Sequence, residues 1–331
     1  MPEVHPWILS SIIILGVLWL LTAVLYIRRR QYLHKPAWLD AALLTWPLCL
    51  FDELVVQVWQ PLLILYGTTD WVPVLLMALF YRALKPSLVA NPSSSRYLLW
   101  YPVILCIIIQ LPLAFSGIAE KHMLIESTPV GHPLDFWPVY ISAMINGFTV
   151  LVLGLLMTEL VQKYHKHLPN QVAVPSQYRL RWLAGALGAT VGLAMIGILL
   201  VTAVTFGFLH ILAWQTGLDL AIAAVMLTIL FLLTIPQRTS PSILDYNRFD
   251  AGDASPDAMR HALAKTGRIL AILPSSTRNQ LTIGDVARQA KVDPTTLALA
   301  SRLLEQQSFA EFVARADRRH EESGQDATGN V

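Results

Sequence analysis

Long apolar segments separated by short polar breaks fill the first 235 residues of the chain. About 20 consecutive apolar residues are enough for a helix to cross the hydrocarbon core of a bilayer, where helices satisfy their own backbone hydrogen bonds. The pattern predicts an all-α fold whose first part is a polytopic bundle of membrane-spanning helices. Seven spans fit it best, and six or eight remain alternatives. The expected spans are residues 7–27, 39–58, 63–84, 98–117, 136–161, 182–207 and 212–235.

The turn between the second and third spans has two candidate positions. Pro61 interrupts the apolar sequence there, and so does GTTD at residues 67–70. Both are typical of a chain reversal, so the sequence leaves both positions open.

The composition also indicates a bilayer as the solvent for much of the chain. Charged residues make up 14% of it, whereas soluble domains contain about 25%. The net charge of +2 gives the whole chain no strong field for nucleic acid. Cys49 and Cys106 both lie in apolar segments, which is typical of small buried residues rather than of a disulfide or a metal site. No metal site and no cofactor are expected.

Lys and Arg residues are concentrated in alternate loops. Loops 28–38, 82–96 and 162–181 contain four, three and four of them, whereas the opposite loops contain only Lys121. Cytoplasmic loops are enriched in these residues. The N-terminus is therefore expected outside, with everything after about residue 236 in the cytoplasm. His165 and His167, in the third of these loops, are expected on a solvated cytoplasmic surface.

Several polar residues fall inside or next to the expected spans. Such residues are costly at membrane depth, so they often mark a ligand, ion or proton site. Glu53, Gln57 and Gln60 repeat at helical spacing and predict one polar stripe. The alternative is that these residues mark helix ends or satisfy one another between helices. The candidate residues for a ligand reached from outside are Asp52, Glu53, Gln57, His210 and Asp219.

The composition changes after residue 235. Residues 236–255 are rich in Pro, Ser, Asp and Gly and are predicted to be a linker between the membrane domain (1–235) and a small helical domain (256–320). Residues 321–331 are expected to be disordered. Each helix of the small domain begins at a capping signal. These signals are Ser255-Pro256, Thr282 with Asp285, Asp293-Pro294, and Ser308 with Glu311.

Only three residues, Lys291 to Asp293, separate the second and third of these helices. Ala287 is small enough for two helices to cross closely, and Leu297 is placed to pack beneath the turn. This spacing is typical of a helix-turn-helix, which can place its second helix in the major groove of DNA. Small bundles that do not bind DNA share the same pattern.

Residues 281–319, LTIGDVARQAKVDPTTLALASRLLEQQSFAEFVARADRR, resemble the first helix-turn-helix of AraC-type transcriptional regulators. A subgroup of that family has an N-terminal seven-span membrane domain. SQYRLRWLAG (176–185) and VPVLLMALFYRALKP (72–86) are similar to stretches of that domain. The resemblance implies a regulator in the bacterial inner membrane that couples a signal to DNA binding. The matching residues are Leu281, Thr282, Asp285, Ala287, Pro294, Leu297, Gln307, Ser308, Phe309, Phe312 and Arg315.

The chain departs from that family in two ways. The family has tandem helix-turn-helix units, whereas this chain has one, so a homodimer would be needed to present two. Residues 239–331 contain 11 Lys and Arg against 12 Asp and Glu, a weak electrostatic basis for binding DNA. Thr295, Thr296 and Arg302 are expected on an exposed face that contacts bases or phosphates, and Arg278 and Lys291 are candidate phosphate contacts. Alternatively, all five form an ordinary solvated surface.

Three functions remain open. The first is a membrane-embedded AraC-like sensor with DNA as its partner. The second is a membrane sensor whose helix-turn-helix binds a protein partner instead. The third is a small-solute transporter with a regulatory tail. An enzyme is not expected, because the sequence contains no Gly-rich phosphate loop, nucleophile elbow or H-E-x-x-H motif.

Overall fold

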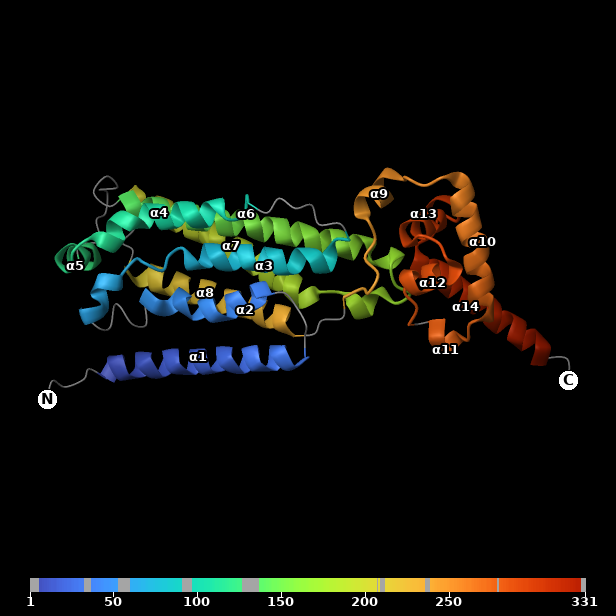
Figure 1. Ribbon diagram of the computed structural model, residues 1–331, viewed down its shortest axis with the longest axis horizontal. Helices are drawn as coiled ribbons and strands as arrows, with labels where there is room; N and C mark the ends of the chain where they lie inside the picture. Colours follow the sequence, from blue (N-terminus) through green and yellow to red (C-terminus); the bar gives the residue numbers. More distant parts are fainter. Residues whose placement is uncertain are drawn as a thin grey trace. The chain divides into compact units, whose positions relative to one another are not determined.

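In the residues that it describes, the computed structural model is built mainly of helices (Figure 1). These are residues 6–32, 37–52, 60–90, 97–126, 137–206, 208, 212–235, 239–278 and 280–328. Within them the only β pairing is one antiparallel bridge, between Val172 and Thr282. The predicted all-α class is confirmed for this part of the chain.

The chain divides into two compact units. We call residues 1–84, 94–158 and 182–236 the apolar unit, and residues 85–93, 159–181 and 237–331 the C-terminal unit. The C-terminal unit thus contains two segments from between the expected spans as well as the tail. Two helices, α3 and α6, begin in the apolar unit and end in the C-terminal unit.

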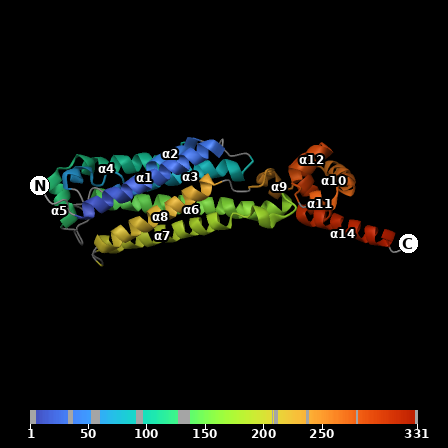
Figure 2. The ribbon, with the colours of Figure 1, turned by 90° about the horizontal axis from the view of Figure 1, so that it is seen from below.

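Helices α3, α4, α6, α7 and α8 run along a common direction in both views (Figures 1 and 2). Many large apolar side chains on these helices are exposed, among them Phe148, Leu155 and Leu199. An apolar surface of this kind is expected where helices face lipid. The elements before α9 are α1 (Pro6–Tyr32), α2 (Ala37–Thr45), η1 (Trp46–Leu50), η3 (Gln60–Leu65), α3 (Val72–Leu88), α4 (Tyr101–Phe115), α5 (Ile118–Glu126), α6 (Trp137–His167), η4 (Leu168–Asn170), η5 (Pro175–Tyr178), α7 (Arg181–Thr205) and α8 (Leu212–Thr234).

Among the described residues, three helices are long and apolar enough to cross a membrane: Trp137–Asn170, Arg181–Thr205 and Gly217–Thr234. They correspond to the last three expected spans. Trp38–Leu50 and Tyr101–Phe115 are apolar but shorter. Helix α6, with 31 residues, is about 46 Å long at 1.5 Å per residue. The hydrocarbon core is about 30 Å thick, so a spanning α6 projects several residues beyond it.

The turn before α3 lies at GTTD, one of the two candidate positions. Gly67 has a φ of 71°, a left-handed conformation that favours glycine. A Cβ added at Gly67 would lie 2.3 Å from Cδ2 of Leu113, so the Leu113 side chain would have to move to admit it. Pro61, the other candidate, lies within η3.

The predicted capping signals of the C-terminal unit are confirmed. Ser255, Thr282 and Asp293 each accept a backbone N–H with the side chain at the start of a helix. Ser308 and Glu311 form the reciprocal capping box, in which Oε2 of Glu311 lies 2.8 Å from the Ser308 nitrogen. The helices are α9 (Tyr246–Ala251), α10 (Pro256–Ile272), α11 (Ser275–Arg278), α12 (Ile283–Ala290), α13 (Pro294–Leu304) and α14 (Phe309–Thr328). Helix α14 extends into the segment expected to be disordered.

The described part of the expected linker, 239–255, is folded into the core of the C-terminal unit. Leu244, Tyr246 and Phe249 are buried there with Leu299 and Val313. The side chain of Asp245 caps α9 by accepting from two backbone nitrogens. The interpretation of this part as a linker is therefore wrong, because three apolar side chains among its polar residues supply core packing.

Candidate functional site: the junction between the α6–α7 loop and the C-terminal helices

Within the C-terminal unit, the end of α6 and the loop between α6 and α7 pack against the tail, residues 239–328. We call this contact the junction. The loop side of the junction carries buried polar and aromatic side chains. The tail side consists of the segment before α10 and of the extended residues at the start of α12. The junction residues are Tyr164, His167, Gln171, Val172 and Ala173 on the loop side, and Ser240, Tyr246, Phe249, Leu281, Thr282 and Ile283 on the tail side.

Two backbone hydrogen bonds join the loop to the start of α12. The nitrogen of Ala173 donates to the oxygen of Leu281 at 3.1 Å, and the nitrogen of Ile283 donates to the oxygen of Gln171 at 2.8 Å. They flank the bridge between Val172 and Thr282. Thr282 is also the N-cap of α12. The loop is therefore bonded to the residue at which α12 begins.

His167, the last residue of α6, is only 2% exposed. Its ring stacks on Tyr246, with centroids 4.8 Å apart, and meets Phe249 edge-on at 5.3 Å. Burial lowers the pKa of His167, and the nearby Asp250 carboxylate only partly offsets that effect. The neutral imidazole is therefore favoured, and the 3.6 Å approach of its Nε2 to Asp250 is not a full ion pair. The expectation of a solvated His167 is wrong, because the tail covers it.

Gln171, Tyr164 and Tyr246 form hydrogen bonds in the junction, although Oε1 of Gln171 is buried without a hydrogen-bond partner among the described residues. Nε2 of Gln171 donates to the Tyr246 hydroxyl at 3.1 Å. The Tyr164 hydroxyl donates to the Tyr178 oxygen at 3.1 Å and accepts from the Ser240 nitrogen at 3.0 Å. Burial raises the pKa of Tyr246 to about 12. Both phenols therefore stay protonated and serve as fixed hydrogen-bonding groups.

Two of the candidate DNA contacts are buried. Thr295 is 4% exposed, so the expectation that it lies on an exposed face is wrong; α13 packs against α9 and α10. Arg278 is fully buried. Its guanidinium donates to the oxygens of Leu273 and Ala316 and pairs with Asp317 at 2.8 Å. Arg278 joins α11 to α14 and is not free to contact phosphate.

The other three candidates remain at the surface of the C-terminal unit. Lys291 is exposed and ends α12 in a left-handed conformation, with φ of 53°. Thr296 is partly exposed, and its nitrogen and hydroxyl both bond to Asp293 at 3.0 Å. Arg302 is exposed and lies over the ring of Phe249, 5.0 Å from its centroid. A DNA contact by these residues stays a prediction.

The middle of α13 is covered on all sides. Residues 297–301 are all buried, and five consecutive residues exceed one helical turn. The helices that contact α13 are α9, α10, α12 and α14. A recognition helix must present one free face to the major groove. This stretch of α13 presents none.

The candidate ligand residues are described only in part. Glu53, Gln57 and His210 lie outside the described residues. Asp52 is buried and accepts from the Gly67 nitrogen at 3.0 Å, while Asp219 is partly buried on α8. The described residues contain no group of three His, Cys, Asp or Glu side chains that could hold a metal ion.

Lys121 adds a buried charge near Asp52 that sequence reasoning did not single out. It is fully buried on α5 and donates to the oxygen of Ile64. Burial lowers the pKa of Lys121, and the Asp52 charge partly opposes this. The sequence indicated only that Lys121 is the one Lys or Arg in the loops that were expected to face outside.

The junction residues His167, Tyr246 and Phe249 were also missed as a group. In sequence, His167 lies in a charged loop, and Tyr246 and Phe249 lie among turn-forming residues. The three-residue spacing of the two aromatic residues was the only local indication of a buried helix face.

Comparison with family models, with curated proteins and with solved structures found no match for this chain.

Proposed function

We propose that this chain is a membrane-embedded sensor whose C-terminal unit is its cytoplasmic output module. The junction carries the proposal. Helix α6 is one continuous helix that begins in the apolar unit and ends at His167, in the C-terminal unit. A shift of α6 therefore displaces a side chain that packs on Tyr246 and Phe249. A packed contact with two arrangements is a physical means of passing a signal.

The make-up of the C-terminal unit supports seven spans with the N-terminus outside. Residues 85–93, 159–181 and the tail from 237 onward pack together, so they lie on one side of a bilayer. The chain between residues 93 and 159 must then cross the bilayer an even number of times, by α4 and α6. The chain between residues 181 and 237 must do the same, by α7 and α8. These segments coincide with loops rich in Lys and Arg, which favours the cytoplasm. Three spans before residue 85 complete the seven.

The burial of α13 favours a protein partner over DNA as the target of the output module. Residues 297–301 offer no face to a major groove, whereas Leu303 and Leu304 expose large apolar side chains directly after them. Exposed apolar side chains at the end of a helix suit a protein surface better than a phosphate backbone. On this view the C-terminal unit keeps the form of a helix-turn-helix and recognises a protein with the end of α13.

DNA binding is the second candidate function. It rests on the resemblance of residues 281–319 to AraC-type regulators and on the exposure of Lys291 and Arg302. It requires α13 to be uncovered, and two chains to provide two helix-turn-helix units.

The first test uses the full chain in lipid nanodiscs, because a fragment starting at residue 239 would lack His167 and Gln171. We would measure its binding to the DNA upstream of its own gene and to random DNA at several salt concentrations. We expect no preference between the two. A salt-dependent preference that Arg302→Ala or Lys291→Ala removes would establish the DNA function and overturn the protein-partner proposal.

The partner is tested in living cells by a photo-crosslinking amino acid at Leu303, with Arg268 on α10 as the control position. Both side chains are exposed. We expect one discrete protein adduct at Leu303 that is absent at Arg268 and is weakened by Leu304→Ser. Equal adducts at both positions would refute a recognition surface at the end of α13.

A further inference from the structure

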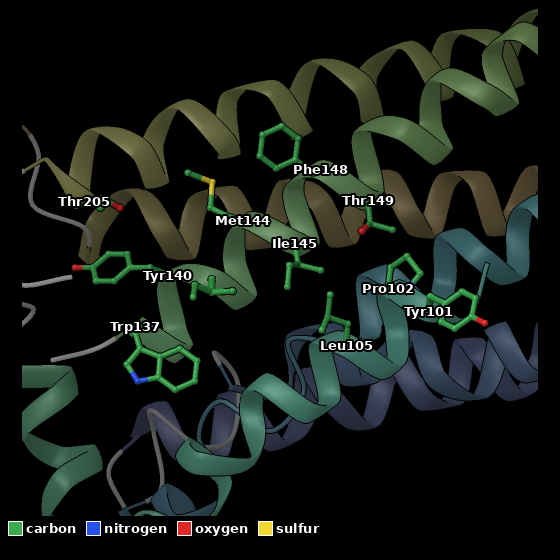
Figure 3. Close-up of a pocket in the computed structure, with 11 residues that line it drawn as sticks. Tyr101, Pro102, Leu105, Trp137, Tyr140, Met144, Ile145, Phe148, Thr149 and Thr205 are labelled. Carbon is green, nitrogen blue, oxygen red and sulfur yellow. The ribbon is translucent and has the colours of Figure 1, made fainter. Parts of the chain in front are cut away.

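A cavity of about 760 Å³ lies within the apolar unit, between α4 and α6 and next to the end of α7 (Figure 3). We call it the α4–α6 cavity. Its lining includes Tyr101 and Leu105 from α4, Trp137, Ile145 and Phe148 from α6, and Thr205 from α7. All of these residues belong to one compact unit.

The described lining of the α4–α6 cavity is mainly aliphatic and aromatic and contains no charged side chain. Its polar atoms are the hydroxyls of two tyrosines and two threonines and one indole nitrogen, from Tyr101, Tyr140, Thr149, Thr205 and Trp137. The hydroxyl of Thr205 already donates to the oxygen of Val201, at 2.8 Å. Pockets for polar ligands contain placed hydrogen-bonding or charged groups that fix the ligand's orientation. The α4–α6 cavity is suited to a ligand that is apolar along its length.

The cavity is elongated along α6. Its lining runs from Trp137, the first residue of α6, to Thr149. At 1.5 Å per residue these positions are about 18 Å apart. One leaflet contributes about half of the ~30 Å hydrocarbon core, so this length matches one layer of acyl chains. Trp137 lies at one end of this lining, and tryptophan is enriched where membrane helices meet the membrane interface.

Helices α4 and α6 are held together beside the cavity by a buried polar contact. Nε2 of Gln110 donates to the Ser142 hydroxyl at 3.0 Å, and Sγ of Cys106 lies 3.4 Å from the same oxygen. Ser142 and Cys106 adjoin the lining residues Ile141 and Leu105 in sequence. This contact joins the two helices beside the cavity.

We propose that the α4–α6 cavity binds one acyl chain of a membrane glycerolipid, which enters sideways from the bilayer. The source of this ligand is the bilayer itself, because α6 and α7 both have the length and hydropathy of membrane spans. Binding rests on the cavity alone. Its consequence rests on the proposed function: α6 carries the cavity at one end and His167 at the other, so the bound chain is the signal.

The test uses the full chain in vesicles of phosphatidylethanolamine and phosphatidylglycerol that contain a phosphatidylcholine with a diazirine in one acyl chain. Adducts are mapped by mass spectrometry after illumination. In the unaltered chain we expect adducts concentrated on the lining segments of α4 and α6. Even labelling of all exposed apolar residues, including Leu155, would show surrounding lipid only and overturn the proposal.

Two variants give the matched comparison. Ile145→Trp fills the cavity, whereas Leu155→Trp adds the same side chain at a position of α6 that is 51% exposed and outside the lining. We expect Ile145→Trp to reduce labelling of the cavity severalfold and Leu155→Trp to leave it unchanged. Labelling of α4 that is unaffected by Ile145→Trp would contradict the proposal. Leu105→Phe is the second filling variant if Ile145→Trp does not fold.

Hydrogen exchange in residues 240–250, measured in the same vesicles, separates binding from signalling. Selective labelling together with a change in exchange between the unaltered chain and Ile145→Trp supports both proposals. Selective labelling without any change in exchange supports the acyl-chain site and counts against the sensor. Absence of selective labelling overturns the site, whatever the exchange shows.

Discussion

The rings of His167 and Tyr246 lie nearly parallel, with centroids 4.8 Å apart and planes inclined by 17°. They are separated by 79 positions in the chain. One ends α6 and the other begins α9. The stack therefore joins the last residue of α6, a helix long and apolar enough to cross a membrane, to the first helix of the tail. This contact makes several expectations measurable.

Acidification is expected to weaken the junction. Burial holds the pKa of His167 below its ordinary 6.5, with Asp250 opposing and Lys166, Arg302 and Lys163 adding to the shift. An unfolded His167 therefore binds a proton more readily than the folded one. Its stabilising effect is complete above about pH 6.5 and declines as the pH falls below that value.

The measurement is hydrogen exchange of the α9 segment at about pH 5.5 and about pH 7.5, corrected for intrinsic exchange. We expect faster relative opening at the lower pH. His167→Phe keeps an aromatic ring without a titrating group, so its opening should not depend on pH in this range. Equal pH dependence in both proteins would show that another group is responsible.

Loss of Arg278 is expected to destabilise the C-terminal unit. Its side chain is 1% exposed and pairs with Asp317, which is 22% exposed. Removing one partner of a buried ion pair costs about 3 kcal/mol because the other charge loses its compensation. Thermal unfolding of Arg278→Ala should show this. Arg288→Ala, at an 82% exposed side chain, should unfold like the unaltered chain.

Asp293→Ala is expected to weaken the start of α13. The carboxylate of Asp293 accepts from the nitrogen and hydroxyl of Thr296 and lies 3.4 Å from Arg248. Loss of an N-cap costs about 1 kcal/mol. Hydrogen exchange of α13 should accelerate accordingly, while Asp257→Ala, at a 97% exposed side chain, should not change it. Unchanged α13 exchange in Asp293→Ala would show that packing alone fixes this helix end.

Ser142→Ala is expected to loosen α4 from α6. It removes the partner of the Gln110 amide, which is buried. Hydrogen bonds between membrane helices contribute about 0.6–2 kcal/mol. Unfolding of the full chain in mixed micelles should show a loss of this size, compared with Ser176→Ala at an exposed site in η5. A neutral Ser142→Ala would indicate that Gln110 finds another partner.

The orientation has its own measurement. Gln177 in the α6–α7 loop and Glu120 in α5 are exposed. Each is replaced by a single cysteine, in a chain in which Cys49 and Cys106 have been replaced. A membrane-impermeant maleimide added to intact cells should label the cysteine at Glu120 and not the one at Gln177. The reverse pattern would invert the proposed topology.

Local features of the sequence predicted local features of the structure. The caps Ser255, Thr282 and Asp293 were predictable because each depends on residues within one helical turn. Contacts between distant segments were not predictable in the same way. Periodicity does not show that α9 packs on α13, which carries the buried Thr295, that α14 contacts Arg278, or that Tyr246 meets His167. Those positions are set by partners 38 to 79 residues away in the chain.

The backbone bridge between Val172 and Thr282 has a consequence for biosynthesis. The ribosome completes the α6–α7 loop before α12, and the tail can close on that loop only if both lie on the same side of the bilayer. In a seven-span chain, failure of α7 or α8 to insert would leave Leu244, Tyr246 and Phe249 without His167 to cover them. Exposed apolar side chains of this kind are what chaperones and proteases recognise in incomplete proteins. If the chain is the membrane protein that we propose, the junction makes folding of the tail conditional on correct membrane integration, and we expect misinserted chains to be removed.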